Sequence, residues 1–351
     1  MSRIKIIATF LSLNVFVLQV FAQGGDVIGD KTNQANGSAS FVGGGSLNKA
    51  SGKSSFVGGG SLNKAIGISS FVGGGQDNEA SGNVSFVGGG QDNKASGNVS
   101  FVGGGSLNKA IGISSFVGGG SLNKASGGKS FVGGGGDNEA SGYASFVGGG
   151  SLNKASALSS FVGGSGGNVN KEHAGTILFS SFEMNNIKEL IPFYSVASGE
   201  FAVRATGGVR FVTAIEKLSG EPSSGSYLAS GSGSWSSMSS KEQKENFETI
   251  DSQEILNKVI SMPVQKWNYK SQDDSVKHIG PFAEDFEQAF GVGDFKGRIT
   301  STDADGVALA AIQGLNEKLQ QELVGKQQEI DSLNKRLEHL EKIVMSMGKP
   351  Q

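Results

Sequence analysis

The stretch ASGNVSFVGGGQDNKASG, residues 80–97, contains one unit of the repeat that decides the fold of this chain. A large aromatic residue in a Ser-Phe-Val-Gly-Gly segment recurs every fifteen residues, at Phe41, Phe56, Phe71, Phe86, Phe101, Phe116, Phe131, Phe146 and Phe161. An amide residue follows each of them seven positions later, at Asn48, Asn63, Asn78, Asn93, Asn108, Asn123, Asn138, Asn153 and Asn168. A fixed period of this length is typical of a solenoid.

The chemistry of one unit predicts two short strands and two turns. Small polar and large apolar residues alternate through Ser-Ser-Phe-Val, as in a strand with one buried face. The glycine run and the segment around each Asn allow positive φ and so can turn the chain. Stacked coils then place Phe over Phe and Asn over Asn. No proline lies between Phe41 and Phe161, which suits a hydrogen-bonded sheet.

Two other readings of the repeats are weaker. Glycine and serine are abundant in low-complexity disorder, but the strict spacing of an aromatic residue favours an ordered coil. A calcium-binding β-roll needs an acidic ligand in every turn, whereas aspartate occurs in this array only at Asp77, Asp92 and Asp137. The lysines and glutamates that follow each Asn are read as a solvated face. A host-surface or glycan ligand of the repeats is left open.

Each coil offers only Phe, Val, Ala and an occasional Leu or Ile for burial, which makes a thin core for one chain. Three chains side by side would share that core. The pattern resembles the head repeats of trimeric autotransporter adhesins. That resemblance implies a mainly β fold, a trimeric parallel β-roll of fifteen-residue repeats over residues 23–170, and a homotrimer.

The N-terminus predicts export. Arg3 and Lys5 precede an apolar run from Ile6 to Val20, and Ala22 stands before a plausible cut. We expect a signal peptide over residues 1–22 and an extracellular or cell-surface location, in a Gram-negative bacterium; a retained membrane anchor is the alternative.

The composition excludes several classes of function. There is no cysteine, which excludes disulfides and thiol chemistry. The net charge of −2 gives no support to nucleic-acid binding. The three histidines are dispersed and form no metal-ligand cluster. We expect no cofactor and no small-molecule substrate.

Three blocks near the C-terminus carry a second resemblance. They are WSSMSSKEQKENF at 235–247, KHIGPFAEDF at 277–286 and DADGVALAAIQGL at 303–315. In this order they resemble the C-terminal intramolecular chaperone of endosialidases and phage tail spikes. The resemblance implies a small α+β domain, at 235–313, that trimerises a β-rich fibre and then cuts itself off.

The same resemblance assigns the site. Ser239 would be the nucleophile, Lys244 the base, and Ser239–Ser240 the scissile bond, in a Ser-Lys variant of the catalytic triad. The family usually has Asp where this chain has Ser240, which puts cleavage in doubt. Asn246 would fix the backbone or polarise the carbonyl. His278 would either assist processing or cap the turn at Gly280 and Pro281.

Local patterns predict the remaining elements. In the connector at 171–234, residues 201–213 read as a β-hairpin around Gly-Gly, and residues 219–234 as a loop or stalk. Asp251 begins a capping box and a helix, and residues 263–269 form a strand. Asp303 and Asp305 would cap a helix near Val307.

Heptad spacing predicts a coiled coil over residues 314–347. Its seam positions are Leu319, Leu323, Lys326, Ile330, Leu333, Leu337, Leu340, Val344 and Met347. Together these features predict an exported homotrimeric fibre, at most a single-turnover self-cleaving serine peptidase. The alternative is a non-cleaving structural adhesin that keeps the C-terminal domain as a trimeric clamp. A glycan hydrolase is disfavoured, because no region outside the repeats is long enough for a catalytic domain.

Overall fold

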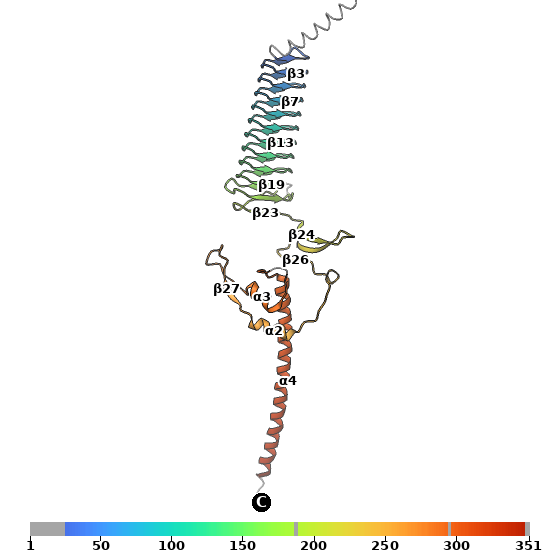
Figure 1. Ribbon diagram of the computed structural model, residues 1–351, viewed down its shortest axis with the longest axis vertical. Helices are drawn as coiled ribbons and strands as arrows, with labels where there is room; N and C mark the ends of the chain where they lie inside the picture. Colours follow the sequence, from blue (N-terminus) through green and yellow to red (C-terminus); the bar gives the residue numbers. More distant parts are fainter. Residues whose placement is uncertain (1–24, 186–188, 294–295, 348–351) are drawn as a thin grey trace, which may run out of the picture. The chain divides into compact units, whose positions relative to one another are not determined.

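The computed structural model describes residues 25–185, 189–293 and 296–347. The signal peptide expected at residues 1–22 lies outside these ranges. The chain divides into two compact units, one ending at Met238 and the next beginning at Ser239. The first is a β-solenoid followed by a small antiparallel sheet, and the second is a small α+β region with a long C-terminal helix (Figure 1).

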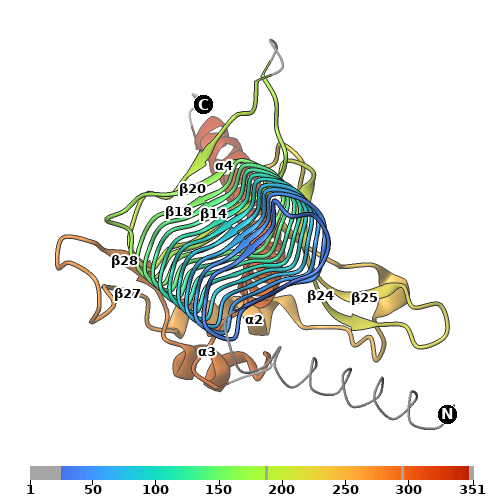
Figure 2. The same ribbon diagram turned by 90° about the horizontal axis from the view of Figure 1, so that it is seen from above.

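The solenoid consists of about ten coils, each of which adds one strand to each of two parallel sheets. Figure 2 shows the coils as a stack of similar outlines, each displaced slightly from the one before. Among the described residues, sheet A contains β1 (Asp26–Val27), β3 (Phe41–Val42), β5 (Phe56–Val57), β7 (Phe71–Val72), β9 (Phe86–Val87), β11 (Phe101–Val102), β13 (Phe116–Val117), β15 (Phe131–Val132), β17 (Phe146–Val147), β19 (Phe161–Gly164), β21 (Ile177–Ser180) and β23 (Phe201–Arg204).

Sheet B runs along the other side of the coils. Within the described part of the chain it contains β2 (Gln34–Ala35), β4 (Lys49–Ala50), β6 (Lys64–Ala65), β8 (Glu79–Ala80), β10 (Lys94–Ala95), β12 (Lys109–Ala110), β14 (Lys124–Ala125), β16 (Glu139–Ala140), β18 (Lys154–Ala155), β20 (Gly167–Val169) and β22 (Phe193–Tyr194). The prediction of a parallel β-solenoid with fifteen-residue coils and two strands per coil is therefore confirmed.

The two sheets differ in what they turn inward and outward. In sheet A the Val of each Phe-Val strand is fully buried and the Phe is half-buried on the outer side. In sheet B the Ala is fully buried and the Lys or Glu before it faces outward. Strands pair residue for residue, so Phe101 lies between Phe86 and Phe116. Because the core is made of Val, Ala and small polar residues, one chain fills its own coil.

A buried ladder of asparagines closes each coil. The side-chain amide of Asn93 donates to the carbonyl oxygens of Gly89 at 2.9 Å and Gly105 at 2.8 Å. Its Oδ1 accepts the backbone N–H of Asn108 at 3.0 Å. These bonds satisfy the buried side chain and two backbone groups that would otherwise lack a partner, the carbonyl of Gly89 and the N–H of Asn108; the carbonyl of Gly105 also accepts from the N–H of Gln91 at 2.9 Å. The residue that precedes each Asn, not the Asn itself, turns the chain, with φ of 52° to 62°.

The fifteen-residue period ends one coil earlier than the sequence predicts. Ser165 pairs with Ser151, fourteen residues away, so the next residues shift by one. Gly167 then donates its N–H to Oδ1 of Asn153, and Asn168 pairs with Lys154. The prediction that Asn168 belongs to the asparagine ladder is wrong, because the last coil lacks one residue.

The hairpin expected at residues 201–213 is also wrong. Residues 201–204 form β23, which pairs in parallel with β21 and extends the solenoid. The following strand, β24 (Gly208–Ile215), pairs antiparallel with β25 (Pro222–Ala229). β25 also pairs with β26 (Trp235–Ser237), so the loop expected at 219–234 contains a strand. The alternating pattern was read correctly as strand, but it spans two different sheets.

The C-terminal unit begins with the 3₁₀ turn η1 (Lys241–Gln243) and the helix α2 (Ser252–Ser261). Asp251 caps α2 by accepting from the N–H groups of Gln253 and Glu254, as the sequence predicts. The strands β27 (Gln265–Trp267) and β28 (His278–Gly280) pair antiparallel, and α3 (Ala283–Phe290) follows.

The last helix, α4 (Ser301–Met347), starts earlier than expected. Thr300 caps it, because its Oγ1 accepts the N–H of Asp303 at 3.1 Å. Asp303 and Asp305 therefore lie inside the first turns, and the prediction that they cap a helix near Val307 is wrong. α2 packs on α4, where a Cβ at Gly314 would overlap the carbonyl oxygen of Ser252. The coiled coil stays a prediction, since α4 is described as a single helix. Among the described residues, no helix is both long and apolar enough to cross a membrane.

Candidate functional site

A single helical turn brings the two residues of the predicted dyad together. Ser239 follows β26, and the chain then turns through η1. Lys244 ends this turn by donating its backbone N–H to the carbonyl of Lys241 at 3.2 Å. The turn folds the chain back, so Nζ of Lys244 donates to Oγ of Ser239 at 2.6 Å. A spacing of five residues therefore places amine and hydroxyl in direct contact.

The contact has the composition that a Ser-Lys nucleophile needs. A serine hydroxyl is a weak nucleophile until a neighbouring base takes its proton. An amine at hydrogen-bond distance can accept that proton once it is itself neutral. Both residues are exposed, so in this single chain water reaches the pair.

Ser240 has a structural role that its position after the nucleophile does not reveal. It is the N-cap of η1, and its Oγ accepts the N–H of Glu242 at 3.3 Å. Serine and aspartate are both strong N-cap residues. The departure from the usual Asp therefore keeps the cap that holds the turn, although it removes a negative charge beside Ser239.

Asn246 contributes through its backbone. Its φ is +57°, the left-handed conformation that asparagine adopts more readily than most residues. Its role, either in fixing the local backbone or in polarising the carbonyl, stays a prediction. The ring of Phe247, next in the chain, lies 5.7 Å from Nζ of Lys241.

His278 lies in β28 and is part of an aromatic cluster. Its Nε2 is 3.0 Å from Oε1 of Gln272, and its ring is 4.9 Å from Trp267 and 5.7 Å from Tyr269. Within the described residues, no hydrogen bond joins His278 to Ser239 or Lys244. The structure therefore places His278 with the strand pair and does not bring it to the dyad.

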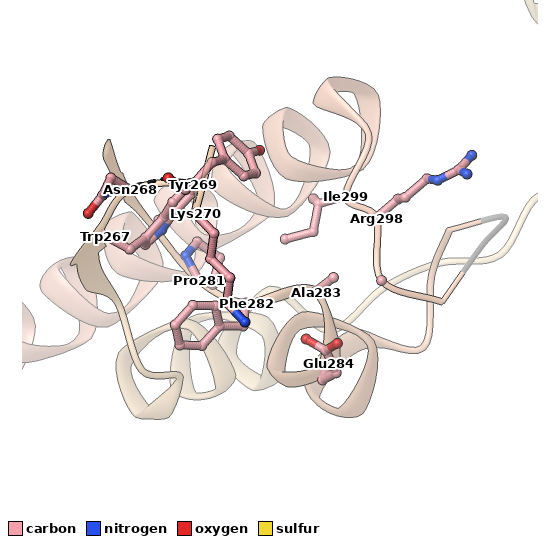
Figure 3. A pocket seen from close by; sticks show the side chains of 12 residues that line it. Trp267, Asn268, Tyr269, Lys270, Pro281, Phe282, Ala283, Glu284, Arg298 and Ile299 are labelled. Atoms are coloured by element: carbon pink, nitrogen blue, oxygen red, sulfur yellow. Dashed lines mark hydrogen bonds between the residues drawn. The ribbon is translucent and has the colours of Figure 1, made fainter. Parts of the chain in front are cut away.

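A pocket of 790 Å³ opens beside this strand pair (Figure 3). Its lining mixes aromatic and charged side chains from the end of β27 and the residues after it, from the start of α3 and from the segment before α4, namely Trp267, Tyr269, Lys270, Phe282, Glu284 and Arg298. Neither Ser239 nor Lys244 lines it, so the dyad and the pocket are separate features. The described residues contain no group of acidic, His or Cys side chains that would hold a metal ion.

Sequence reasoning missed three parts of this region. The cap formed by Ser240 could not be predicted from the sequence, because a serine three residues before a glutamine, here Gln243, is a common pattern. The bond between His278 and Gln272 was hidden because it depends on the loop between β27 and β28. The pocket has no local signal, since its residues come from three separate segments.

Comparison with known proteins places the dyad at the edge of a family match. A search of curated proteins found no match to the chain. Residues 239–292 match the family model described as chaperone of endosialidase, and this match in the C-terminal region is preceded by the β-solenoid of fifteen-residue repeats.

Proposed function

We propose that this chain is an exported homotrimeric fibre whose C-terminal unit guides assembly and then cuts itself off at Ser239–Ser240. The family match suggests an intramolecular chaperone role for that unit. Trimerisation, cleavage and export go beyond the match and rest on the arguments that follow.

The observation that carries the proposal is the 2.6 Å contact between Nζ of Lys244 and Oγ of Ser239. Two independent boundaries coincide with it. The match to the chaperone family begins at residue 239, and the second compact unit begins at Ser239. A cut after Ser239 would therefore release the chaperone unit almost whole and leave the solenoid unit intact.

A chaperone role explains why the C-terminal unit leaves apolar side chains uncovered. On α4 the heptad residues Leu323, Leu333 and Leu337 are all exposed. Partner helices bury such a seam in a coiled coil. Glycine-rich coils from separate chains have little to hold them in register before contacts form, which makes association slow. A helical seam that associates first supplies that alignment.

The chemistry needs only groups that the chain contains, together with water. In the proposed trimer, neutral Lys244 takes the proton of the Ser239 hydroxyl, and the oxygen attacks the Ser239 carbonyl carbon of a neighbouring copy, because attack on the carbonyl of its own residue would close a strained four-membered ring. The lysine ammonium then gives a proton to the departing amine of Ser240. Water hydrolyses the resulting ester. Loss of the chaperone unit makes unfolding of the fibre hard to reverse.

The alternative is a structural adhesin that keeps its C-terminal unit as a clamp. It is favoured by one observation, the exposure of Ser239 and Lys244 to water, which leaves the lysine amine well solvated. A charged, hydrated amine is a poor base for a hydroxyl.

Intact-mass measurement on purified full-length protein separates the two functions. Self-cleavage predicts a fragment that begins at Ser240, absent from Ser239→Ala and Lys244→Ala variants. Glu242→Ala, in the same turn, is a matched control that should still be cut. Full-length protein alone under all folding conditions would favour the clamp and exclude the peptidase.

A further inference from the structure

Sheet A of the solenoid carries a continuous apolar strip on its outer side. Nine phenylalanine rings, from Phe41 to Phe161, stack with centroids 4.6 to 5.4 Å apart. In register, the strip continues through Ile177 and Phe201 and ends at Asp26. At about 4.8 Å per strand the nine rings alone extend for roughly 40 Å. An uninterrupted apolar strip of this kind marks an interaction surface.

The stacking decides what kind of partner fits. Neighbouring rings in the middle of the ladder are within 1° to 4° of parallel. Each ring face is therefore covered by the next ring, and the edges point outward. Recognition of cations uses the faces of aromatic rings, which are not available here. The edges suit close packing against another apolar surface.

The three glycines that follow the Phe-Val pair in the first eight coils give an independent indication, as the coil of Phe101 shows. At Gly103 a Cβ would overlap the carbonyl oxygen of Gly118, so the next coil requires glycine there. Gly105 has a φ of +86°, a conformation that favours glycine. The middle residue, Gly104, has neither reason, since a Cβ on it would meet only the carbonyl oxygen of Gly89, at 3.9 Å.

The middle glycine is nevertheless present in eight consecutive coils, at Gly44, Gly59, Gly74, Gly89, Gly104, Gly119, Gly134 and Gly149. At five of them, from Gly59 to Gly119, φ is not positive, and a Cβ would have ordinary contact at 3.9 to 4.0 Å or open space. Among the described residues, neither a positive φ nor a close neighbour of the Cβ requires glycine at these five positions. Glycine is also used where another backbone approaches closely, and that backbone would have to come from outside the chain.

We infer that the ladder face, defined as the nine phenylalanines together with the eight middle glycines, packs against the same face of other copies of this chain. The inference rests on the homotrimer proposed above and names the surface by which the solenoids meet. A second copy is favoured because it presents the same spacing at every coil, so one good contact repeats along the whole strip. A different partner would need the same repeat.

The distribution of charged residues over the two sheets also favours sheet A as the interface. In sheet A the outward residue from β3 to β19 is always Phe, whereas in sheet B, from β4 to β18, it is Lys or Glu. Burying charged groups without partners is costly, so sheet B is suited to stay in water while sheet A is covered. The exposed heptad leucines of α4 are a second surface on the same chain that calls for identical partners.

Single cysteines in one coil test the inference in the full-length chain, which has no cysteine of its own. Gly104→Cys lies on the ladder face, Lys109→Cys on sheet B, and Ile113→Cys at an exposed corner. A short bis-maleimide should join chains at least about ten-fold faster at Gly104→Cys than at either control, because thiols held at an interface have a high effective concentration. Light scattering on the same samples reports the oligomeric state.

A second pair of variants tests close approach. Gly104→Trp should fit a single coil, since a Cβ there meets little, but it would hold two ladder faces apart. The expected result is a lower melting temperature for the assembled solenoid and loss of crosslinking at Gly89→Cys. Ile113→Trp is the matched control, because the equivalent positions two and three periods later already hold Tyr143 and Leu158. It should change neither the melting temperature nor the crosslinking.

The possible failures are distinguishable. An oligomer by light scattering with equal or faster crosslinking at Lys109→Cys would overturn the ladder face as the interface and leave the homotrimer standing. An oligomer whose melting temperature and crosslinking are unchanged by Gly104→Trp would also overturn the ladder face as the interface and leave the homotrimer standing. A monomer by light scattering would overturn the proposed homotrimer, and the ladder-face inference with it.

Discussion

At the scale of single residues, the asparagine ladder concentrates more hydrogen bonding in one side chain than any other feature of the repeat. Asn93 is 1% exposed. It supplies partners to two glycine carbonyls and to the next asparagine N–H. A buried polar group that loses its partner costs far more than the bond contributes when made. The residue therefore matters through the groups it satisfies as much as through its own bonds.

We expect Asn93→Ala to lower the free energy of unfolding of the solenoid by about 2–4 kcal/mol, because it leaves buried backbone groups without partners. Chemical denaturation measures this. Asn83→Ala is the matched control, since Asn83 is exposed and accepts one bond, from the N–H of Ile68 at 3.1 Å. Its cost should stay below about 1 kcal/mol. Equal losses for the two variants would contradict the role assigned to the buried ladder.

A second prediction at this scale concerns which bond breaks. A serine oxygen that attacks the carbonyl of its own residue closes a strained four-membered ring, whereas attack on the preceding carbonyl closes a five-membered ring. A cut at Ser239–Ser240 therefore calls for an oxygen from a neighbouring copy or for an activated water. The expected C-terminal fragment begins at Ser240. A fragment that begins at Ser239 would move the scissile bond to Met238–Ser239 and would keep Ser239 as nucleophile.

How far the site follows from sequence is also decided at single residues. The resemblance to the chaperone family predicted that Ser239 and Lys244 act as a pair, and the structure places their side chains at 2.6 Å. A 3₁₀ turn capped by Ser240 brings the two side chains together. The sequence does not predict this turn, because three residues have no periodicity to detect. His278 was placed near processing by resemblance alone, and its bond to Gln272 depends on contacts that only the folded chain contains.

At the scale of elements, the outer row of sheet B is an interstrand charge ladder. Lys94 pairs with Glu79 at 3.0 Å, and Lys124 pairs with Glu139 at 2.9 Å. Partial burial opposes ionisation of Glu79, but hydrogen bonds from Ser81 and Lys94, with the charges of Lys94 and Lys64, outweigh it and lower the pKa of Glu79. A group whose pKa is lowered by folding stabilises the fold while it is ionised.

This gives the sign of a pH dependence. The contribution of Glu79 is present above its ordinary pKa of 4.5 and is lost as pH falls through the lower folded value. We expect Glu79→Gln to destabilise the solenoid at pH 7 by a modest amount typical of an exposed pair, up to about 1 kcal/mol. Chemical denaturation at pH 7 and at pH 3 measures the free energy of unfolding of Glu79→Gln and of the natural chain. The difference between the two should be smaller at pH 3. A difference that is unchanged or larger at pH 3 would refute it.

Elements also show where sequence patterns reach their limit. The fifteen-residue period predicted the strands, their parallel stacking and the Phe ladder, because each coil repeats the same local pattern. It failed where that pattern changes by one residue, at Asn168, since the effect of a missing residue is felt only through pairing with the previous coil. It failed again at residues 201–213, where an alternating pattern says nothing about which strand becomes the neighbour.

At the scale of the whole molecule, the two compact units differ in how much apolar surface each of them buries. The solenoid unit has a continuous core of its own, from Val42 to Ala202. The C-terminal unit buries few large side chains, chiefly Leu256 and Phe286, and ends in a long helix with an exposed apolar seam. A solenoid with its own core and a weakly packed C-terminal unit are consistent with the proposed self-cleaving chaperone. The proposed trimer then predicts that the helix decides whether copies associate at all.

Leu333→Glu should prevent that association. Leu333 is a seam residue and is 52% exposed in the single helix, so the substitution costs little before assembly. In a coiled coil it removes a buried leucine, worth about 2–5 kcal/mol per helix, and brings like charges together at the seam. Gln328→Glu, which adds the same charge off the seam, is the matched control. Light scattering of the full chain should show a monomer for Leu333→Glu and a trimer for the control. A trimer for both variants would mean that the copies associate through the solenoid without the helix. The C-terminal unit would then not direct their alignment.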